Sequence, residues 1–303
     1  MTKARPLILN INKPKDISSY DVIRKWKPRL KKLGKVGHFG TLDPFADGVL
    51  MLGVAGAQRL NEYIHECLPK TYLATGILGV ETPTGDMTVD PTQLDESDFL
   101  KSVIGKFDIP FIQQKVQDKF LGEYWQAPHK YSAAKFEGKA LHQWAREGVE
   151  IKKEKKKREI YSLEVVEYNF PKLSFRVEVS SGTYIRSLFS DIANELGTIG
   201  TLESLTREKV GGCTLDNSLS CDLTEVDPIP FIEIDTVLPF GEIIFADKEA
   251  KLYSNGVKLK QDRISESRDG KIKDYYWAKD LADNILGLAT IENEHIVSKV
   301  NFS

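Results

Sequence analysis

The sequence has little cysteine and no long apolar run. Its three cysteines, Cys67, Cys213 and Cys221, form no C-x-x-C pair in a chain of 303 residues. This sparse, odd count argues against a disulfide framework and is typical of reduced thiols, each read most simply as a buried structural side chain. No stretch approaches the roughly 20 apolar residues of a membrane-spanning helix, and the mainly apolar segment 7–11 is too short for a signal-peptide core. We therefore expect a cytoplasmic protein without a membrane segment.

The signatures of several enzyme classes are also missing. The histidines at 38, 65, 129, 142 and 295 are scattered, and none forms the zinc-peptidase pattern H-E-x-x-H or pairs with closely spaced cysteines. The deaminase pattern P-C-x-x-C and the hydrolase pattern G-x-S-x-G do not occur. The glycines at 34, 37 and 40 match neither common nucleotide-binding motif. The sequence thus predicts no metal and no small-molecule cofactor, and a phosphotransferase that holds a nucleotide with these glycines is a weak alternative.

Charge is distributed unevenly, although the formal net charge is only -2. Residues 13–35 contain nine Lys or Arg against two Asp, whereas residues 216–249 contain nine Asp or Glu against one Lys. A basic front and an acidic rear suit a protein that offers one face to a polyanion. A solvated basic helix without a partner explains the same charges, so charge alone does not decide between the two.

Hydrophobic periodicity predicts both helices and strands. Helices are expected over 20–33, 95–104, 132–147 and 185–196. Strands are expected over 6–13, 70–80, 160–169 and 173–179. Ser18 or Ser19 is expected to cap the first helix and Gly34 to end it. Residues 202–213 read as a helix or an edge strand, and the charged run 151–159 reads as a hairpin tip.

The segment 34–50 carries the densest chemical signal in the chain. It holds four glycines, one histidine and two aspartates. Asp43 lies between Leu42 and Pro44, and the proline biases it toward extended backbone, which makes a stiff mount for one carboxylate. Such an aspartate can act as a nucleophile or a base, although an aspartate in a turn more often hydrogen-bonds its own backbone. For Asp47 we expect a capping role in preference to a glycosidase-like carboxylate pair.

The stretch 37–50, which reads GHFGTLDPFADGVL, resembles the signature of the TruB-type tRNA pseudouridine synthases. Further motifs are similar to those of this family in order and spacing. They are NKPK with SS at 12–19, KTY with LG and TPTGD at 70–86, QAP with YSAAK and G at 126–138, SGTYIRSL with D at 181–191, and LTR with G at 205–211. An ordered set that covers roughly the first 215 residues is far more specific than any one motif.

This resemblance implies an isomerase that converts uridine to pseudouridine in the T-loop of tRNA, at the position known as 55. The base leaves C1′, turns and rejoins through C5, which needs no cofactor. The target is flipped out of an RNA loop, where unpairing costs least. The implied fold is α+β, with a mixed, largely antiparallel central sheet flanked by helices. We expect a catalytic domain over 1–235 and a small β-rich, PUA-like domain over 236–303, where turn signals separate short strands.

The resemblance implies that Asp43 is the essential catalytic group. It attacks the sugar, attacks the base or removes a sugar proton, and these possibilities stay open. An ionised carboxylate in a closed pocket needs a partner, and Arg186 suits this role because a guanidinium binds carboxylates bidentately and stays protonated. Tyr72 is expected to stack on the flipped base, with its hydroxyl accepting or relaying the C5 proton. Its simpler reading is a core aromatic residue on a strand.

Four further residues are implied in substrate binding. Leu205 is expected to form an apolar wall of the pocket, and Tyr184 to line the same pocket. His38 is expected to fill the gap left by the flipped nucleotide or to stack on its neighbour. Lys70 is expected to contact phosphates together with the basic stripe 13–35. Ordinary core packing for Leu205 and a histidine satisfied by loop carbonyls for His38 are the simpler alternatives.

The expected partner is therefore the T-arm stem-loop of tRNA, bound by a monomer. The alternative is a non-catalytic RNA-binding or tRNA-folding module on the same scaffold, which predicts loss of acidic or aromatic pocket residues. Asp43, Tyr72 and Arg186 are all present, which favours the enzyme.

Overall fold

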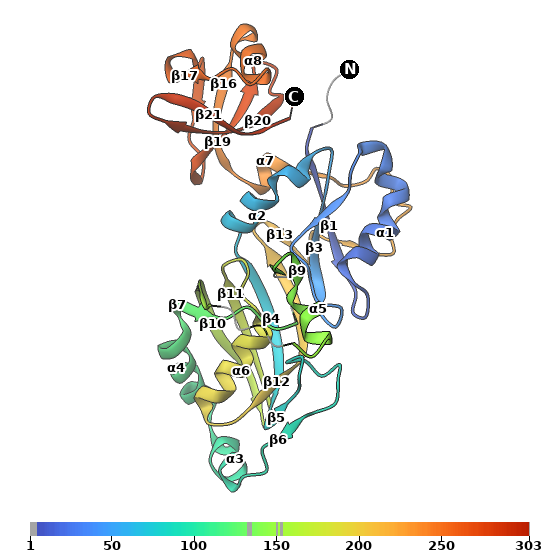
Figure 1. Ribbon diagram of the computed structural model, residues 1–303, viewed down its shortest axis with the longest axis vertical. Coiled ribbons are helices and arrows are strands. Elements are labelled where there is room, and N and C mark those ends of the chain that lie inside the picture. The colour runs from blue at the N-terminus through green and yellow to red at the C-terminus, as the bar shows by residue number, and fades with distance from the viewer. Residues whose placement is uncertain (1–4, 132–134, 150, 152–153, 303) are drawn as a thin grey trace.

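The computed structural model describes residues 5–131, 135–149, 151 and 154–302. These residues form an elongated molecule, with a large sheet in its body and a smaller sheet, near the C-terminus, at one end (Figure 1). Within the described ranges, no helix is both long enough and apolar enough to cross a bilayer.

A mixed sheet of eleven strands forms the body of the described chain. Its strands are β1 Leu7–Lys13, β2 Gly37–Phe39, β3 Asp47–Val54, β4 Lys70–Leu78, β7 Gly122–Gln126, β10 Lys156–Asn169, β11 Lys172–Val179, β12 Gly200–Val210, β13 Cys213–Thr214, β14 Leu219–Ser220 and β15 Ile232–Glu233. The main path runs β14-β1-β3-β12-β4-β11-β10-β7. The β1–β14 and β3–β12 pairs are parallel, and the other pairs among these strands are antiparallel. The expected α+β fold with a largely antiparallel central sheet is confirmed.

Helix α1, Ser19–Leu30, forms where the sequence predicts it. Ser18 and Asp21 make a capping box, in which each side chain accepts the backbone N–H of the other residue. The apolar face, with Trp26 at its centre, is buried against the sheet. A 3₁₀ turn follows and ends at Gly34, whose φ of 94° lies in the region that favours glycine.

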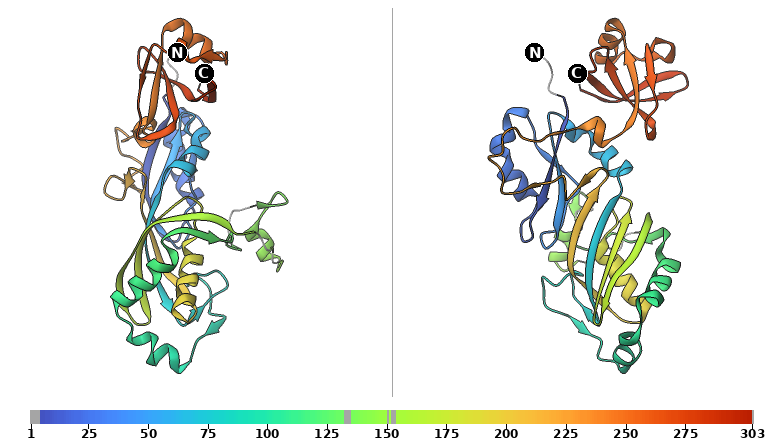
Figure 2. Two further views of the ribbon diagram at one scale, coloured as in Figure 1. Left: turned by 90° about the vertical axis from the view of Figure 1, so that its left-hand side faces the viewer. Right: turned by 180° about the vertical axis from the view of Figure 1, so that it is seen from behind.

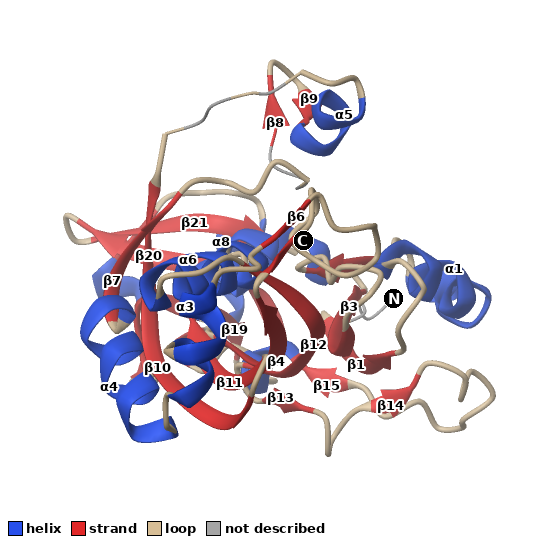
Figure 3. Ribbon diagram, turned by 90° about the horizontal axis from the view of Figure 1, so that it is seen from below, coloured by secondary structure: helices blue, strands red, loops and turns tan. Residues whose placement is uncertain are grey.

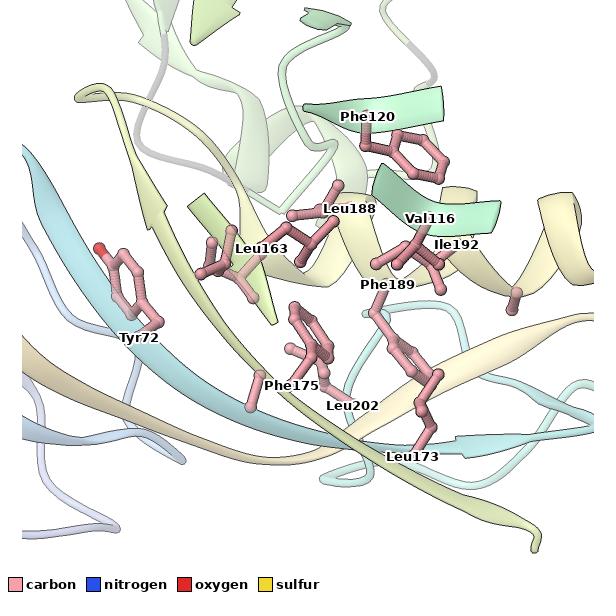
Figure 4. Packing of buried hydrophobic residues seen from close by; sticks show 14 of the residues in the cluster. Tyr72, Val116, Phe120, Leu163, Leu173, Phe175, Leu188, Phe189, Ile192 and Leu202 are labelled. Carbon is pink, nitrogen blue, oxygen red and sulfur yellow. The ribbon is translucent and has the colours of Figure 1, made fainter. Parts of the chain in front are cut away.

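Helices α4 (Ile109–Phe120) and α6 (Ile185–Leu196) pack on the sheet and on each other (Figure 3). Phe175 of β11 and Phe189 of α6 lie stacked in their shared core, with ring centroids 6.0 Å apart (Figure 4). The Phe189 ring lies directly on Gly76 of β4, where an added Cβ would come within 2.2 Å of it. Because interiors are close-packed, this contact fixes the distance between α6 and the sheet.

An arm stands out from the sheet after β7 (Figures 2 and 3). Among its described residues are the hairpin of β8 (Lys135–Phe136) and β9 (Lys139–Ala140) and the helix α5 (Leu141–Arg146). The remaining short elements of the body are β5 Val80–Glu81, β6 Gln93–Leu94, α2 Asn61–Cys67 and α3 Asp98–Ser102.

A second, curled sheet of PUA-like type occupies the C-terminal part of the described chain, and a small β-rich unit there is confirmed. Its order is β17-β21-β20-β19-β16-β18. The elements are α7 Ile234–Val237, β16 Phe240–Phe245, α8 Asp247–Ser254, β17 Leu259–Lys260, β18 Glu266–Arg268, β19 Ile272–Asp280, β20 Ile285–Glu292 and β21 His295–Asn301. The predicted domain boundary between residues 235 and 236 lies inside α7 and stays a prediction.

Lys279 of β19 is a buried cation at the junction of the two sheets. Its ammonium lies 2.6 Å from Glu242, 3.0 Å from Asp235 and 3.0 Å from Asp283. Arg5, which precedes β1, lies 2.7 Å from the same Asp235. The network therefore connects the start of the large sheet to α7 and to the small sheet.

We expect Lys279→Met to lower the free energy of unfolding by about 2–3 kcal/mol, because it leaves partly buried carboxylates without their cation. The loss stays below that of a fully buried pair because 58% of the Asp283 side chain is exposed. Urea denaturation measures it. Lys299→Met, which removes a surface pair with Glu292, is the control and should cost less than about 1 kcal/mol. Equal losses in the two variants would contradict the stabilising role of Lys279.

Over 202–213 the helix alternative is wrong and the strand alternative is confirmed, but the strand lies at the centre of the sheet and not at its edge. Most of these residues lie in β12, which pairs with β4 on one side and β3 on the other, at the centre of the sheet. Polar residues such as Thr206 and Arg207 make the segment look unlike a central strand. They are tolerated there because Arg207 lines a pocket, whereas Thr206, whose side chain points to the other face of the sheet, is only partly buried.

The helix expected over 132–147 is wrong in its extent. Residues 132–134 lie outside the described residues, and in the rest only 141–146 is helical. Glu137 and Gly138, with φ of 50° and 80°, turn the chain into the β8–β9 hairpin instead. The prediction of a hairpin tip over 151–159 is wrong for its second half, because residues 156–159 begin strand β10 and pair with β7.

The predicted separation of basic and acidic surfaces is wrong in part. The acidic connector after β14 lies along helix α1, so that Lys25 pairs with Asp222. Arg29 lies 3.6 Å from Glu225 and 3.7 Å from an oxygen of the neighbouring aspartate at 227. Part of the basic helix is therefore already neutralised within the molecule.

Candidate active site

A pocket of about 600 Å³ lies where the β2–β3 connection, β4, β12 and the N-terminus of α6 meet. All seven site residues predicted from the sequence line it: His38, Asp43, Lys70, Tyr72, Tyr184, Arg186 and Leu205. Figure 4 shows Tyr72 at the margin of the apolar core, with its hydroxyl directed away from the buried rings. The structure thus brings together side chains from segments far apart in the sequence.

The loop that carries Asp43 is fixed through its backbone. The Ser19 hydroxyl donates to the Leu42 carbonyl at 3.0 Å and accepts the Leu42 N–H at 2.9 Å. Arg207 of β12 donates to backbone carbonyls on both sides of the loop, at 3.1 and 2.8 Å. Asp47 opens β3 and caps no helix, so the capping role expected for it is wrong.

Lys13 holds the same loop from a buried position, so its predicted place in the basic surface stripe is wrong. It is fully buried, and its ammonium donates to the carbonyls of Pro14, Ile17 and Pro44 at 2.8, 2.9 and 3.3 Å. Burial lowers the pKa of Lys13 to about 8, an effect that Asp47 opposes. Lys13 is therefore a structural residue beneath the Asp43 loop.

Arg186 lies at the centre of the polar network in the pocket. Its Nε lies 3.1 Å from an oxygen of Asp43, and its Nη1 donates to Asp86 at 3.0 Å and to the Thr84 carbonyl at 2.8 Å. Its Nη2 donates to the Tyr131 carbonyl at 3.2 Å. Only 6% of the Arg186 side chain is exposed, so its direction is set by these partners. One guanidinium therefore orients Asp43 from the floor of the pocket.

Burial raises the pKa of the Asp43 carboxyl above the ordinary value of 3.8. Arg186 opposes this rise, but it also pairs with Asp86, whose charge raises the pKa of Asp43 further. Of the Asp43 side chain, 35% remains exposed, on the side of the pocket. Asp43 is thus a carboxylate that opens onto the pocket and is more basic than a surface aspartate.

As the expected catalytic carboxylate, Asp43 would have to be ionised to act, and its pKa is raised, so we expect the single-turnover rate of an enzyme that uses it to fall on the acid side at a pH above 3.8. Rates measured from about pH 4 to about pH 8 would show this limb, with circular dichroism confirming the fold at each pH. A limb at or below the ordinary aspartate value would contradict the assignment.

Basic side chains also line the pocket. Lys70 is buried and donates to the Ser181 hydroxyl at 3.0 Å, and His65 Nδ1 lies 2.7 Å from the same oxygen. Within the described chain neither Lys70 nor Arg207 has a carboxylate in ion-pair contact. Burial, reinforced by Arg207, lowers the pKa of Lys70 to about 7, and burial lowers that of His65 to about 4. Arg207 stays charged, and an anionic group of a substrate bound here would favour the charged form of Lys70.

His38 lines the pocket from β2. Its Nδ1 is buried and has no hydrogen-bond partner in the described part of the chain, which contradicts a histidine satisfied by loop carbonyls. Burial, with a smaller effect of Arg207, lowers the pKa of His38, which favours its neutral form in the lining of the cavity. This geometry suits stacking on a base.

Sequence reasoning missed four contributors to this site. Asp86 and Ser181 lie inside recognised motifs, but nothing in the sequence says that Asp86 is buried against Arg186. Arg207 was noted only as part of the closing motif. His65 carries no motif signal, and only the packing of α2 brings it to the pocket. No group of three or more His, Cys, Asp or Glu able to hold a metal ion occurs among the described residues.

Residues 27–185 match the N-terminal domain of the TruB family of pseudouridylate synthases. The chain belongs to this family. It is 37% identical over 263 residues to a protein named tRNA pseudouridine synthase B from Clostridium kluyveri, covering 84% of this chain and 86% of that protein. It is 41% identical over 268 residues to a protein of the same name from Dehalococcoides mccartyi, covering 86% and 85%. This TruB-family chain is therefore a pseudouridine synthase, an isomerase.

Solved structures share the fold. A chain in the crystal structure of a Cbf5-Nop10-Gar1 complex matches with a TM-score of 0.72 and 22% identity, over 98% of this TruB-family chain and 85% of its own length. A chain of the archaeal box H/ACA sRNP Nop10-Cbf5 complex gives 0.70 and 20%, over 98% and 86%. Because the match spans nearly the whole chain, the likeness of fold includes the C-terminal sheet.

Proposed function

We propose that this TruB-family enzyme converts uridine to pseudouridine in the T-loop of tRNA, at position 55, and that it binds the T-arm as a monomer. Relatives at 35–41% identity are named tRNA pseudouridine synthase B, which supports tRNA as the substrate. The observation that carries the proposal is the contact of Asp43 with Arg186 inside a pocket that Tyr72 also lines.

Asp43 is the proposed essential group of the reaction. The C1′–N1 bond breaks, the detached uracil turns, and a C1′–C5 bond forms. The C5 proton then leaves and N1 gains a proton, so the product is an isomer of the substrate. Asp43 supplies the ionised carboxylate that these reaction steps need, and Arg186 orients it and keeps it ionised. Tyr72 stacks on the flipped base, and its hydroxyl is placed to accept or relay the C5 proton.

The remaining pocket residues hold the flipped nucleotide. Leu205 offers an apolar wall and Tyr184 a second aromatic face. His38 fills the gap in the RNA stack or stacks on the neighbouring base. Lys70 contributes a cation for a backbone phosphate, from within the pocket instead of from the outer surface.

The exposed lysines of α1 and of the segment that follows it are the proposed contact for the RNA stem. Lys27, Lys31, Lys32 and Lys35 are exposed, and no ion pair involves them within the described residues. Lys25 and Arg29 of α1 already form ion pairs with the acidic connector after β14. The positive charge left free for a polyanion is therefore on the lysines that lead from α1 to the glycine-rich loop. These free lysines would attract the phosphates of the RNA at long range.

A T-arm hairpin labelled with tritium at C5 of the target uridine tests the proposal. Excess enzyme should release the label in one turnover, because C5 loses its hydrogen when it bonds to C1′. A hairpin with cytidine at the target position is the control and should release none. Tight hairpin binding with no release would favour the alternative of a non-catalytic RNA-binding module.

The phosphotransferase alternative finds no support in the geometry. The glycine-rich loop enters strand β2, which pairs with β3, and does not open onto the N-terminus of a helix. A phosphate cradle depends on such a helix and on its free N–H groups.

A further inference from the structure

The backbone of Tyr131 connects Arg186 to a histidine that the proposed mechanism does not use. The Tyr131 carbonyl accepts a hydrogen bond from Arg186 Nη2 at 3.2 Å. The Tyr131 N–H donates to Nδ1 of His129, also at 3.2 Å. A side chain that bonds the N–H two residues on fixes the intervening turn. The N–H and the carbonyl of Tyr131 belong to adjacent peptide units that meet at its Cα, so these two hydrogen bonds hold Tyr131 between His129 and Arg186.

The imidazole of His129 is itself held in place. Its ring centroid lies 6.3 Å from that of Tyr184 and 6.2 Å from that of Tyr131. It also lies close to Gly85, where an added Cβ would be 3.3 Å from His129 Nε2 and 3.4 Å from Arg186 Cβ. The histidine ring and the arginine stem therefore rest on the same glycine, side by side.

We propose that His129 is a positioning residue for the pseudouridine synthase reaction, which acts by holding the Tyr131 carbonyl against Arg186 and so keeping Arg186 aimed at Asp43. The inference rests on the roles of Asp43 and Arg186 proposed above. His129 makes no contact with the reacting atoms in this account, and its effect passes through the turn and the guanidinium.

The protonation of His129 agrees with an acceptor role. Burial, and then the nearby charges of Arg186 and Lys130, lower the pKa of His129 to about 3. The ring is therefore neutral near physiological pH, and Nδ1 keeps the lone pair that the Tyr131 N–H needs, with the proton on Nε2.

The same segment holds the neighbouring residue of the pocket. Gln126, at the end of β7, accepts the Tyr184 N–H at 2.7 Å and donates to the Tyr184 carbonyl at 3.0 Å. Tyr184 is the N-cap residue of α6, and its side chain caps no N–H of the first turn; Gln126 instead fixes the Tyr184 backbone through both its N–H and its carbonyl. The root of the arm therefore holds both the backbone entering α6 and the side chain of Arg186, and a change in the arm would reach the catalytic network through these two contacts.

Two substitutions separate the hydrogen bond from the ring packing. His129→Phe keeps an aromatic ring beside Tyr184 but has no acceptor. His129→Asn loses the ring, but its Oδ1 sits the same number of bonds from the backbone as Nδ1 and accepts an N–H two residues on. We expect the Phe variant to lose about fivefold in the single-turnover rate on the T-arm hairpin, the range of one neutral hydrogen bond, and the Asn variant to keep the wild-type rate.

The affinity for the hairpin and the melting temperature of the protein should match the wild type in both variants. A general loss of structure would lower both. The proposal is overturned if the Phe variant keeps the full rate, if the Asn variant is as slow as the Phe variant, or if the loss appears in affinity instead of rate. Wild-type enzyme measured in parallel distinguishes a failure of the proposed function from a failure of the proposed role of His129. An inactive wild type defeats the proposed function, whereas an active wild type with an equally active Phe variant defeats only the role of His129.

Discussion

The Asp43→Asn variant is expected to form no detectable pseudouridine, a loss of at least about a thousandfold, because an amide can neither attack as a nucleophile nor accept a proton. Asparagine has nearly the same shape as aspartate, and the loop around it is held through backbone atoms that the substitution leaves untouched. The variant should therefore fold normally and bind a T-arm hairpin with wild-type affinity. Single-turnover tritium release and a binding titration on the same RNA measure both quantities.

Asp47→Asn is the matched control for this experiment. Asp47 lies in the same loop region but does not line the pocket. Its variant should react within about tenfold of the wild type, well short of the loss expected for a catalytic group. Wild-type turnover by the Asp43→Asn variant would show that another group performs the chemistry. Equal losses in the two variants would show that the loop needs its charge for folding.

The Arg186→Gln variant is expected to lose both activity and stability. It leaves Asp86, of which only 6% is exposed, and Asp43 beside each other without their shared cation. Breaking a buried ion pair in this way typically costs about 3–5 kcal/mol. The single-turnover rate should fall at least about a hundredfold, because Asp43 loses the partner that keeps it ionised and aimed. Urea denaturation and tritium release measure the two effects.

Arg176→Gln is the control for Arg186. Arg176 lies on β11 with 41% of its side chain exposed and pairs with Glu208 at 2.8 Å. Its removal should cost less than about 1 kcal/mol, as for other surface pairs, and should leave the rate unchanged. A stable, active Arg186→Gln variant would mean that neither the fold nor the reaction depends on the buried network.

The parts of the fold that depend on local sequence could be predicted. The Ser18 cap, the apolar stripe and Gly34 predict helix α1, and the structure places this helix within a few residues of the prediction. The pocket residues were found because motifs fix their order along the chain. Their meeting in space follows from the sheet, in which the parallel and antiparallel neighbours of β12 bring distant segments together.

The parts of the fold and of the site that depend on tertiary contacts could not be predicted from the sequence. Lys13 looks like one more surface lysine, and only the fold shows that loop carbonyls surround its ammonium. Asp86 reads as a turn residue, although its buried pairing with Arg186 crosses from the β4–β7 region to α6. The central position of β12 could not be predicted because several of its polar side chains are partly or fully exposed, and periodicity reports burial instead of hydrogen-bond pairing.

Mapping of pseudouridine in tRNA after incubation with the pure protein tests the central claim most directly. Unmodified tRNA transcripts would be treated with the enzyme, digested and sequenced by mass spectrometry after chemical tagging of pseudouridine. We expect one new pseudouridine per tRNA, at uridine 55 of the T-loop, and none after treatment with the Asp43→Asn variant. Transcripts that stay unmodified, or that gain pseudouridine only at another position, would contradict the account.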